Sequence, residues 1–186
     1  MILYIHGFGS SGKGNKANIL REELNQYNFF TPSLSYIPDL AIDTLEQLIE
    51  YSLCKNEPVH LMGSSLGGYY SIYLAHKYNL KAILINPSIK PYETLQLALG
   101  RAFSYHDQSK FEWNEQHIQK LLPYDITDIN PEHFLLLTQT GDELLDYKVA
   151  VEKLKGCQTN IIEGGDHGFV NIENHLQEIK DFFNLL

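Results

Sequence analysis

Residues 63–67 read Gly-Ser-Ser-Leu-Gly and stand between a short apolar run and a stretch of helical periodicity. Ser65 has glycine two positions before and two positions after it, the G-x-S-x-G pattern of a nucleophile elbow. On so tight a turn the serine backbone is strained, and larger flanking side chains would collide with the neighbouring strand and helix. The pattern predicts that Ser65 is an accessible nucleophile, with Ser64 a helix cap or packing residue. The alternative is an ordinary glycine-rich helix start.

Short apolar runs recur on both sides of this turn, and each is followed by residues at helical spacing. The runs lie at 2–5, 29–34, 58–63, 82–85, 134–137 and 159–162, and the helical stretches at 17–27, 41–53, 66–74, 92–103, 147–154 and 172–186. Four-residue apolar runs without alternation are typical of parallel strands buried on both faces. The sequence therefore predicts one α/β domain over residues 1–186, with a mainly parallel sheet of about six strands and helices on both faces.

One segment departs from this alternation. Residues 104–131 are rich in aromatic, acidic and histidine side chains and have no long apolar run. We interpret them as a short, lid-like insertion over a site.

Polar residues follow several of the predicted strands where the strands end. His6 closes the first, Asp142 follows the run at 134–137, and His167 lies in a glycine-flanked loop after the last. Ligands of open α/β sheets bind at the carboxyl ends of the strands, so these residues are expected to lie near Ser65. A serine hydroxyl needs a base, and an imidazole oriented by a carboxylate is that base. The order Ser65, Asp142, His167 predicts a catalytic triad, with His6 shaping the neighbouring loop.

Two further carboxylates compete with Asp142 for the acid role. Glu143 is adjacent, but its extra methylene changes the geometry, and Asp146 stands where it would cap a helix beginning near Tyr147. Asp142 is preferred because it comes directly after the strand. His167 itself has an alternative interpretation as a turn or capping residue.

The composition limits the other classes of function. A net charge of −9 argues against nucleic acid or an anionic membrane surface as partner. Cys54 and Cys157 form no CxxC pair, and no His/Cys cluster has metal-ligand spacing, so reduced thiols and no metal or cofactor are expected. The sequence has no basic leader and no apolar run of about 18 residues. We expect a cytoplasmic protein that acts on a small molecule.

Several motifs together resemble the α/β-hydrolase superfamily, and within it the small bacterial YqiA-type esterases. They are Tyr4-Ile-His-Gly-Phe8, residues 63–68, Asn86-Pro87, residues 139–143, Asp146-Tyr147 and residues 164–169. The resemblance extends over nearly the whole chain. It implies a serine hydrolase of small acyl esters or thioesters, with the triad at Ser65, Asp142 and His167. It also implies an oxyanion hole from the backbone N–H groups of Phe8 and Leu66.

Apolar side chains near the predicted mouth suit an acyl chain better than a charged or sugar-like group. These candidates are Tyr69, Phe103, Tyr105, Phe111, Trp113 and Phe169. Core packing is an equally good interpretation for Tyr69 and Phe103.

Two other functions remain open from the sequence. Residues 7–14 match G-x-x-x-x-G-K, so Lys13 and the loop backbone would hold phosphates in a nucleotide-binding protein. Gly14, however, replaces the serine or threonine that would bind magnesium. The second alternative is a binding module that keeps the hydrolase fold without activity. It is disfavoured because all three triad residue types are present.

Overall fold

The computed structural model describes residues 1–185 and contains the predicted alternation of strands and helices. The strands are β1 (Ile2–Ile5), β2 (Phe29–Phe30), β3 (His60–Ser65), β4 (Lys81–Pro87), β5 (Phe134–Gln139) and β6 (Gln158–Ile162). The α-helices are α1 (Asn15–Glu23), α2 (Pro38–Leu53), α3 (Leu66–Tyr78), α4 (Pro91–Thr94), α5 (Glu115–Gln119), α6 (Tyr147–Lys153) and α7 (Leu176–Phe183). Short 3-10 helices occur at Leu95–Ala98, Leu122–Tyr124, Pro131–His133 and Ile172–His175.

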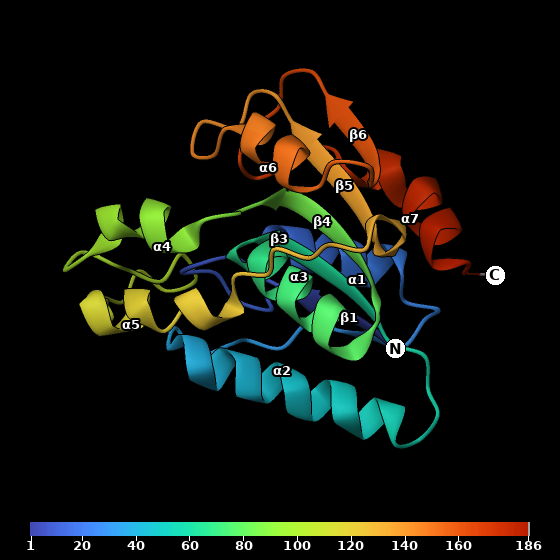
Figure 1. Cartoon of the computed structure of the whole chain (residues 1–186), viewed down its shortest axis with the longest axis horizontal. Coiled ribbons are helices and arrows are strands. Elements are labelled where there is room, and N and C mark those ends of the chain that lie inside the picture. The colour runs from blue at the N-terminus through green and yellow to red at the C-terminus, as the bar shows by residue number, and fades with distance from the viewer. Residues whose placement is uncertain (186) are drawn as a thin grey trace.

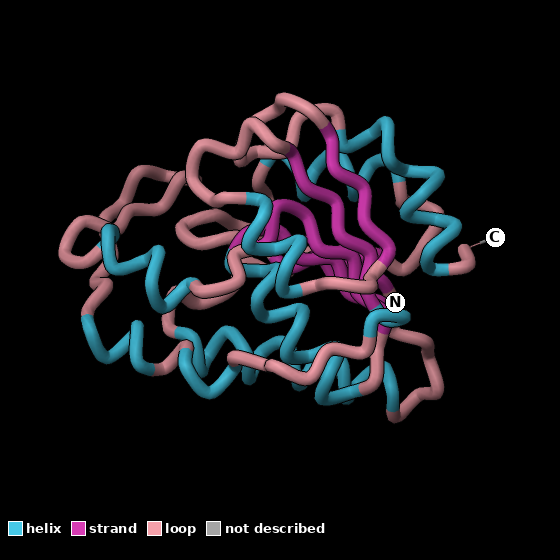
Figure 2. The backbone as a smooth tube through the Cα atoms, turned by 45° about the horizontal axis from the view of Figure 1, so that its top comes forward, coloured by secondary structure: helices cyan, strands magenta, loops and turns pink. Residues whose placement is uncertain are grey.

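The strands of the described chain form one parallel sheet in the order β2-β1-β3-β4-β5-β6 (Figure 2). From β1 the chain first passes to β2 on one side and then to β3 on the other. The direction of winding therefore reverses between β1 and β3, whose paired residues run from Ile2–His60 to Ile5–Gly63. Such a switch point opens a crevice at the carboxyl ends of the two strands, which is where Ser65 lies.

Helices cover both faces of the sheet (Figure 1). The helices α2, α3 and α6 bury side chains such as Leu45 and Leu74 against one face. On the other face, α1 and α7 bury Leu20 and Phe183. Because both faces are covered, the central strands consist almost entirely of buried residues, as their apolar runs predicted. The predicted α/β fold is confirmed.

The second strand is shorter than predicted. Residues 29–34 were expected to be extended and paired, but β2 contains only Phe29 and Phe30. The following residues bond to the loop after β1 instead: the Thr31 hydroxyl donates to the Gly12 carbonyl, and the Leu34 N–H donates to His6 Nε2. These bonds redirect the chain away from the sheet and toward the site.

The predicted helix over residues 92–103 was wrong. A single turn of α4 passes into the 3-10 helix Leu95–Ala98, and Gly100 has a left-handed φ of 70°. Backbone groups in this stretch are used by Trp113, whose ring N–H donates to the Leu95 carbonyl and whose carbonyl accepts from Gly100. Trp113 thus bonds to the Leu95 carbonyl and the Gly100 N–H, two backbone groups that a continuous helix would have used.

The segment 104–131 is tied to the core. It contains α5, and its buried Trp113, Ile118 and Leu121 pack in the same cluster as α2 and α3. The Tyr69 hydroxyl, from α3, donates to the Leu121 carbonyl at 2.8 Å. These contacts hold the part of the segment from Trp113 to Leu121 against the core.

The last predicted helix is divided in two. A 3-10 helix at Ile172–His175 precedes α7, which ends at Phe183, and Leu186, the predicted last residue, lies outside the described residues. No helix within residues 1–185 is both long and apolar enough to cross a membrane.

Candidate active site

Ser65 occupies a strained turn between β3 and α3. Its backbone angles are φ 55° and ψ −121°, a conformation that side chains rarely adopt. The turn needs its glycines: a Cβ on Gly63 would lie 2.2 Å from the Gly67 carbonyl oxygen, and one on Gly67 would lie 2.0 Å from the Ile5 carbonyl oxygen. The backbone packing is that of a nucleophile elbow. Ser64 lies on β3 rather than capping the helix, and its hydroxyl accepts from the Lys16 ammonium.

Ser65, His167 and Asp142 form a continuous hydrogen-bonded line. His167 Nε2 lies 3.1 Å from Ser65 Oγ. On the other side of the ring, Nδ1 lies 2.9 Å and 3.0 Å from the two carboxylate oxygens of Asp142. This arrangement places the proton on Nδ1 and leaves the Nε2 lone pair facing the serine, as a general base requires. The Asp142 side chain is only 2% exposed, whereas His167 is 21% exposed.

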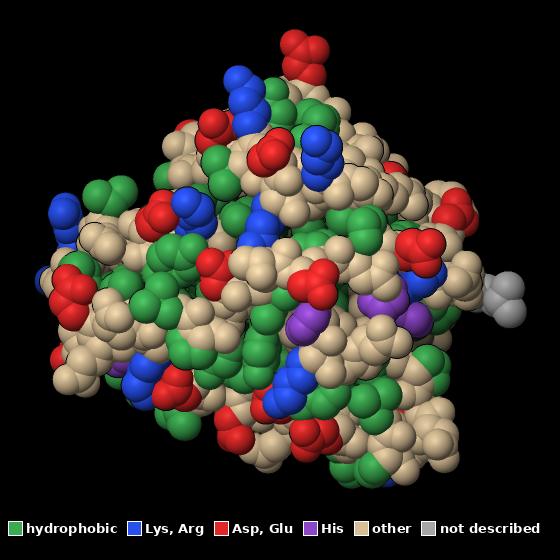
Figure 3. Space-filling view, viewed as in Figure 1, with side chains coloured by type: hydrophobic (Ala, Val, Ile, Leu, Met, Phe, Trp, Pro, Cys, Tyr) green, Lys and Arg blue, Asp and Glu red, His purple; other side chains and the backbone are tan. Residues whose placement is uncertain are grey.

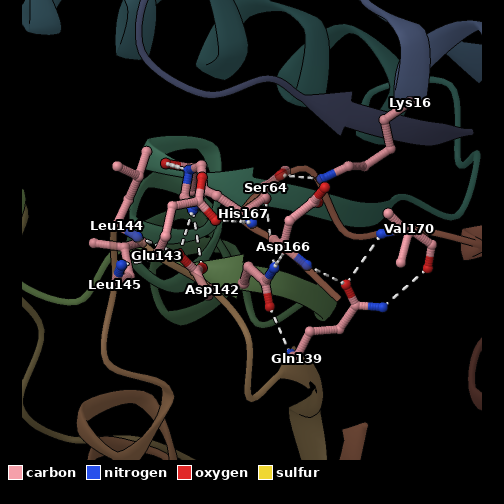
Figure 4. Close-up of polar contacts among 12 residues, drawn as sticks. Lys16, Ser64, Gln139, Asp142, Glu143, Leu144, Leu145, Asp166, His167 and Val170 are labelled. Atoms are coloured by element: carbon pink, nitrogen blue, oxygen red, sulfur yellow. Dashed lines mark hydrogen bonds and ion pairs between the residues drawn. The ribbon is translucent and has the colours of Figure 1, made fainter. Parts of the chain in front are cut away.

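The Asp142 carboxylate is surrounded by donors (Figure 4). Burial alone would raise its pKa, but hydrogen bonds from His167 and from the Leu145 and Leu144 N–H groups outweigh burial and hold its pKa below the ordinary value. Both backbone bonds are 2.9 Å long. Asp142 is therefore a fixed anion beside the imidazole.

The two competing carboxylates have other partners. Glu143 Oε2 accepts the His167 backbone N–H at 3.0 Å, so it holds the loop rather than the ring. Asp146 accepts the Lys148 N–H at 3.0 Å and is the N-cap of α6, as predicted. Of the three, Asp142 bonds to the imidazole.

Phe8 and Leu66 lie beside Ser65 and line the same cavity. Neither backbone N–H donates in the turn, loop and cap hydrogen bonds of residues 1–185. His6 holds the loop that carries Phe8: its Nδ1–H donates to the Gly7 carbonyl at 2.8 Å, and its Nε2 accepts from the Leu34 N–H at 3.0 Å. Burial lowers the pKa of His6, against the effect of its bond to Gly7, and favours this neutral form.

Two buried amides that the sequence did not single out as site residues hold the loop of His167. Asn86 donates to the carbonyls of Asp166 and His167 and accepts the Gln139 backbone N–H. Gln139 accepts the N–H groups of Asp166 and Val170 and donates to the Val170 carbonyl. Asn86 lies near the carboxyl end of β4 and Gln139 is the last residue of β5. Polar residues at the ends of strands that reach the site are the signal that sequence reasoning could have used.

A cavity of about 670 Å³ opens over Ser65 and His167. Phe103 and Tyr105 line it, as predicted, together with Leu95, Leu97, Leu144 and Leu145. Hydrophobic side chains lie exposed between charged ones on the face in Figure 3, toward α4 and α5. Four of the predicted substrate contacts lie outside the lining because they pack elsewhere. They are Tyr69 and Trp113, buried under α5; Phe169, buried against α7; and Phe111, stacked on Tyr36.

The glycine-rich loop at residues 7–14 forms one wall of this cavity. Its backbone is partly used within the protein: the Gly12 N–H donates to Ser33 Oγ at 3.1 Å, and a Cβ on Gly12 would lie 1.9 Å from the Thr31 carbonyl oxygen. Lys13 is exposed, and none of the ion pairs within residues 1–185 includes it. No group of three His, Cys, Asp or Glu side chains suited to a metal occurs among residues 1–185.

Comparison with known proteins places the chain in a family. Residues 1–184 match the model described as "Uncharacterised protein family (UPF0227)". The chain belongs to UPF0227. It is 27% identical over 194 residues to the UPF0227 protein YcfP of Escherichia coli O9:H4 (strain HS), covering 100% of this chain and 99% of the relative. A UPF0227 protein from Shewanella sp. (strain ANA-3) is 27% identical over 193 residues, covering 98% of each chain.

Solved structures similar to this UPF0227 protein have the α/β-hydrolase fold. Est1E from Butyrivibrio proteoclasticus, solved with ferulic acid, has a TM-score of 0.73 at 16% identity and covers 98% of this chain and 87% of its own. Mouse alpha/beta hydrolase domain-containing protein 10 has a TM-score of 0.71 at 18% identity, covering 98% and 89%. A monoacylglycerol lipase from Paleococcus ferrophilus has a TM-score of 0.68 at 16% identity, covering 100% and 94%. At these identities the likeness establishes the fold.

Proposed function

We propose that this UPF0227 protein is a serine hydrolase that cleaves small acyl esters or thioesters through an acyl-enzyme. The observation that carries the proposal is the 3.1 Å contact between His167 Nε2 and Ser65 Oγ, with Asp142 on the opposite ring nitrogen. A neutral imidazole in this position accepts the serine proton, and the carboxylate stabilises the imidazolium that forms. A similar structure named a monoacylglycerol lipase agrees with an ester substrate.

In the first half of the reaction, Ser65 Oγ attacks the acyl carbon while its proton passes to His167 Nε2. The carbonyl oxygen becomes an oxyanion that the N–H groups of Phe8 and Leu66 stabilise. His167 then returns the proton to the leaving alcohol or thiol, and the acyl group stays on Ser65. In the second half, water attacks the acyl-enzyme with His167 again as the base and releases the acid.

A fluorophosphonate probe tests the nucleophile directly. We expect peptide mass spectrometry to locate the adduct on Ser65 and not on Ser64. Ser65→Ala should lose labelling and lower kcat on 4-nitrophenyl butyrate by about 10⁴-fold or more, with the fold intact by circular dichroism. EDTA should leave the rate unchanged. Labelled Ser65→Ala, or a folded wild type that neither reacts with the probe nor cleaves esters, would overturn the proposal and favour a binding module.

A further inference from the structure

The charged side chains that line the cavity are all basic. Lys16 and Arg101 line it together with His167, and no Asp or Glu of residues 1–185 does. This contrasts with the whole sequence, which has 23 acidic and 14 basic residues. The cavity therefore favours a ligand of opposite charge to the protein as a whole.

Lys16 brings its charge next to the nucleophile. It lies in the first turn of α1 and reaches the end of β3, where its Nζ donates to Ser64 Oγ at 2.7 Å (Figure 4). The buried Tyr4 hydroxyl bonds to the same serine. An ammonium has three protons, and none of the ion pairs within residues 1–185 includes Lys16. Among the hydrogen bonds and ion pairs of residues 1–185, Ser64 is its one acceptor, and Lys16 lies between this cavity and a neighbouring one that Asp166 and Glu173 also line.

This cation is incompletely compensated. Burial lowers the pKa of Lys16 to about 8, although the carboxylates of Asp166 and Asp142 act in the opposite direction. The first turn of α1 lines the same wall, and its N-cap, Gly14, has no side chain to bond the free N–H groups. The positive end of the helix dipole thus adds to the charge of Lys16. An anion placed here would replace the water that the ammonium has lost.

The other wall of the cavity has different chemistry. It is formed by the stretch from α4 to residue 105 and by the loop after β5, and it is mainly apolar apart from Arg101, whose side chain is exposed. Its apolar members include Leu95, Leu97, Ala98, Ala102, Phe103 and Leu144. A carbonyl bound at Ser65 therefore lies between a cationic wall and an apolar wall.

On these grounds we propose that the substrate carries an anionic group as well as an apolar chain, and that Lys16 binds the anionic group beside Ser65. This inference rests on the proposed ester hydrolysis and names the substrate class. Lys16 is then a specificity-determining residue, because it contacts the substrate away from the bond that breaks. The sequence signal for it is the i, i+4 spacing of Lys16 and Leu20, which places the lysine on the buried face of α1.

Matched pairs of esters test the proposal on both sides of the reacting carbonyl. The first pair, 4-nitrophenyl hydrogen adipate and its methyl ester, differs by a charge on the acyl side. The second pair, 4-acetoxybenzoate and methyl 4-acetoxybenzoate, differs by a charge on the leaving group. The measured quantity is the ratio of kcat/KM for the anionic ester to kcat/KM for the neutral ester. Each ratio is divided by the ratio of the hydroxide-catalysed hydrolysis rates of the same two esters, so that differences in intrinsic reactivity cancel.

We expect wild type to favour the anionic member of at least one pair, and Lys16→Met to lower that ratio by about 10-fold or more, as for loss of a bond to a charged group. Lys13→Met is the matched control, because Lys13 is exposed and outside the cavity lining. It should keep the wild-type ratio. Lys16→Gln serves as a second variant if Lys16→Met does not fold.

Three results would overturn the proposal. They are a wild type without preference for either anionic ester, a Lys16 variant with the wild-type ratio, and an equal loss on both members of a pair, which would mean that Lys16 only supports Ser64. In each case cleavage of the neutral esters and labelling of Ser65 would leave the proposed function standing. If neither ester is cleaved and Ser65 is not labelled, both proposals fail.

Discussion

The side-chain amide of Asn86 donates a hydrogen bond of 2.9 Å to the backbone carbonyl of Asp166, the residue before His167. Its own carbonyl oxygen accepts the Gln139 N–H at 2.8 Å. One buried side chain thus links the ends of β4 and β5 to the loop that carries the imidazole. The position of His167 relative to Ser65 depends on this link. Replacing Asn86 should therefore displace His167 without removing a group that takes part in the reaction.

We predict that Asn86→Ala lowers kcat by about 10²-fold, the effect of a displacement of about 1 Å at a reacting group. It should also lower the free energy of unfolding by about 1–3 kcal/mol, because the Gln139 N–H loses its buried acceptor. Asn56→Ala is the control: Asn56 is exposed and has a φ of 58°, close to the left-handed φ of 40° at Asn86. If Asn56→Ala lowers the free energy of unfolding as much, backbone strain and not the hydrogen bonds explains the loss of stability.

Asp142 and Asp146 should differ in phenotype. Asp142→Asn is expected to keep its fold and lower kcat by up to about 10⁴-fold, since an amide holds the wrong imidazole tautomer and cannot stabilise the imidazolium. Asp146→Asn should have little effect, because asparagine also caps helices, while Asp146→Ala should cost about 0.5–2 kcal/mol of stability. Ester hydrolysis and thermal melts of the three proteins distinguish these roles. Active Asp142→Asn with inactive Asp146→Asn would exchange the assignments.

The stability of the protein should fall as the solution is acidified below pH 6.5. Burial of the His60 ring, with the N-terminal amino group and Lys81 nearby, lowers its pKa to about 4. The unfolded chain therefore binds this proton at a higher pH than the folded chain, and the stability present above pH 6.5 is lost toward pH 4.

His60→Phe removes this proton and keeps a ring stacked on Phe183, whose centroid lies 4.6 Å from that of His60. Between pH 7.5 and 4.5 the variant should lose about 1–3 kcal/mol less stability than wild type in urea unfolding. At pH 7.5 both rings are uncharged, so any difference there reports packing and the removal of the buried His60 Nδ1, which has no hydrogen-bond partner within residues 1–185. Equal losses in the two proteins would show that His60 does not contribute.

Phe103 should influence the length of the acyl chain that is accepted. Its side chain is 38% exposed at the cavity and lies 4.9 Å from the Tyr105 ring, so a longer chain would cover it. Phe103→Ala should lower kcat/KM for 4-nitrophenyl octanoate by about 5- to 30-fold relative to the acetate, from about 1–2 kcal/mol of lost apolar contact. Tyr51→Ala, on α2, removes an exposed ring outside the cavity lining and should leave the chain-length profile unchanged. A Phe103→Ala profile identical to that of wild type would contradict the prediction.

Sequence reasoning succeeded where one rule linked residues that are distant in the chain. Parallel strands end at one edge of their sheet, so Ser65, Asp142 and His167 could be predicted to meet. It was less successful where backbone groups are the partners. Asn86 and Gln139 bond to backbone carbonyl and N–H groups, which every residue has, so the motifs that contain them did not indicate what they bind. The same reason explains the error at residues 92–103, where Trp113 takes the backbone bonds of a helix.

Lys16 illustrates a different limit. The glycine-rich loop directed attention to Lys13, because a phosphate-binding motif has its lysine there. The lysine that lines the cavity stands three residues later, at i, i+4 spacing from Leu20, and the contact of α1 with the end of β3 brings it to the site. The spacing of residues within a motif cannot indicate which of two nearby lysines a tertiary contact will bury.

The backbone conformation of Ser65 also bears on how the chain has been selected. A φ of 55° with a side chain present costs about 1–3 kcal/mol, and a glycine would relieve that cost while losing about 0.5–1 kcal/mol in chain entropy. Selection for folding alone would therefore favour glycine at this position over serine. Under the proposed function, the chain gives up some of its own stability at this position for the reactivity of Ser65.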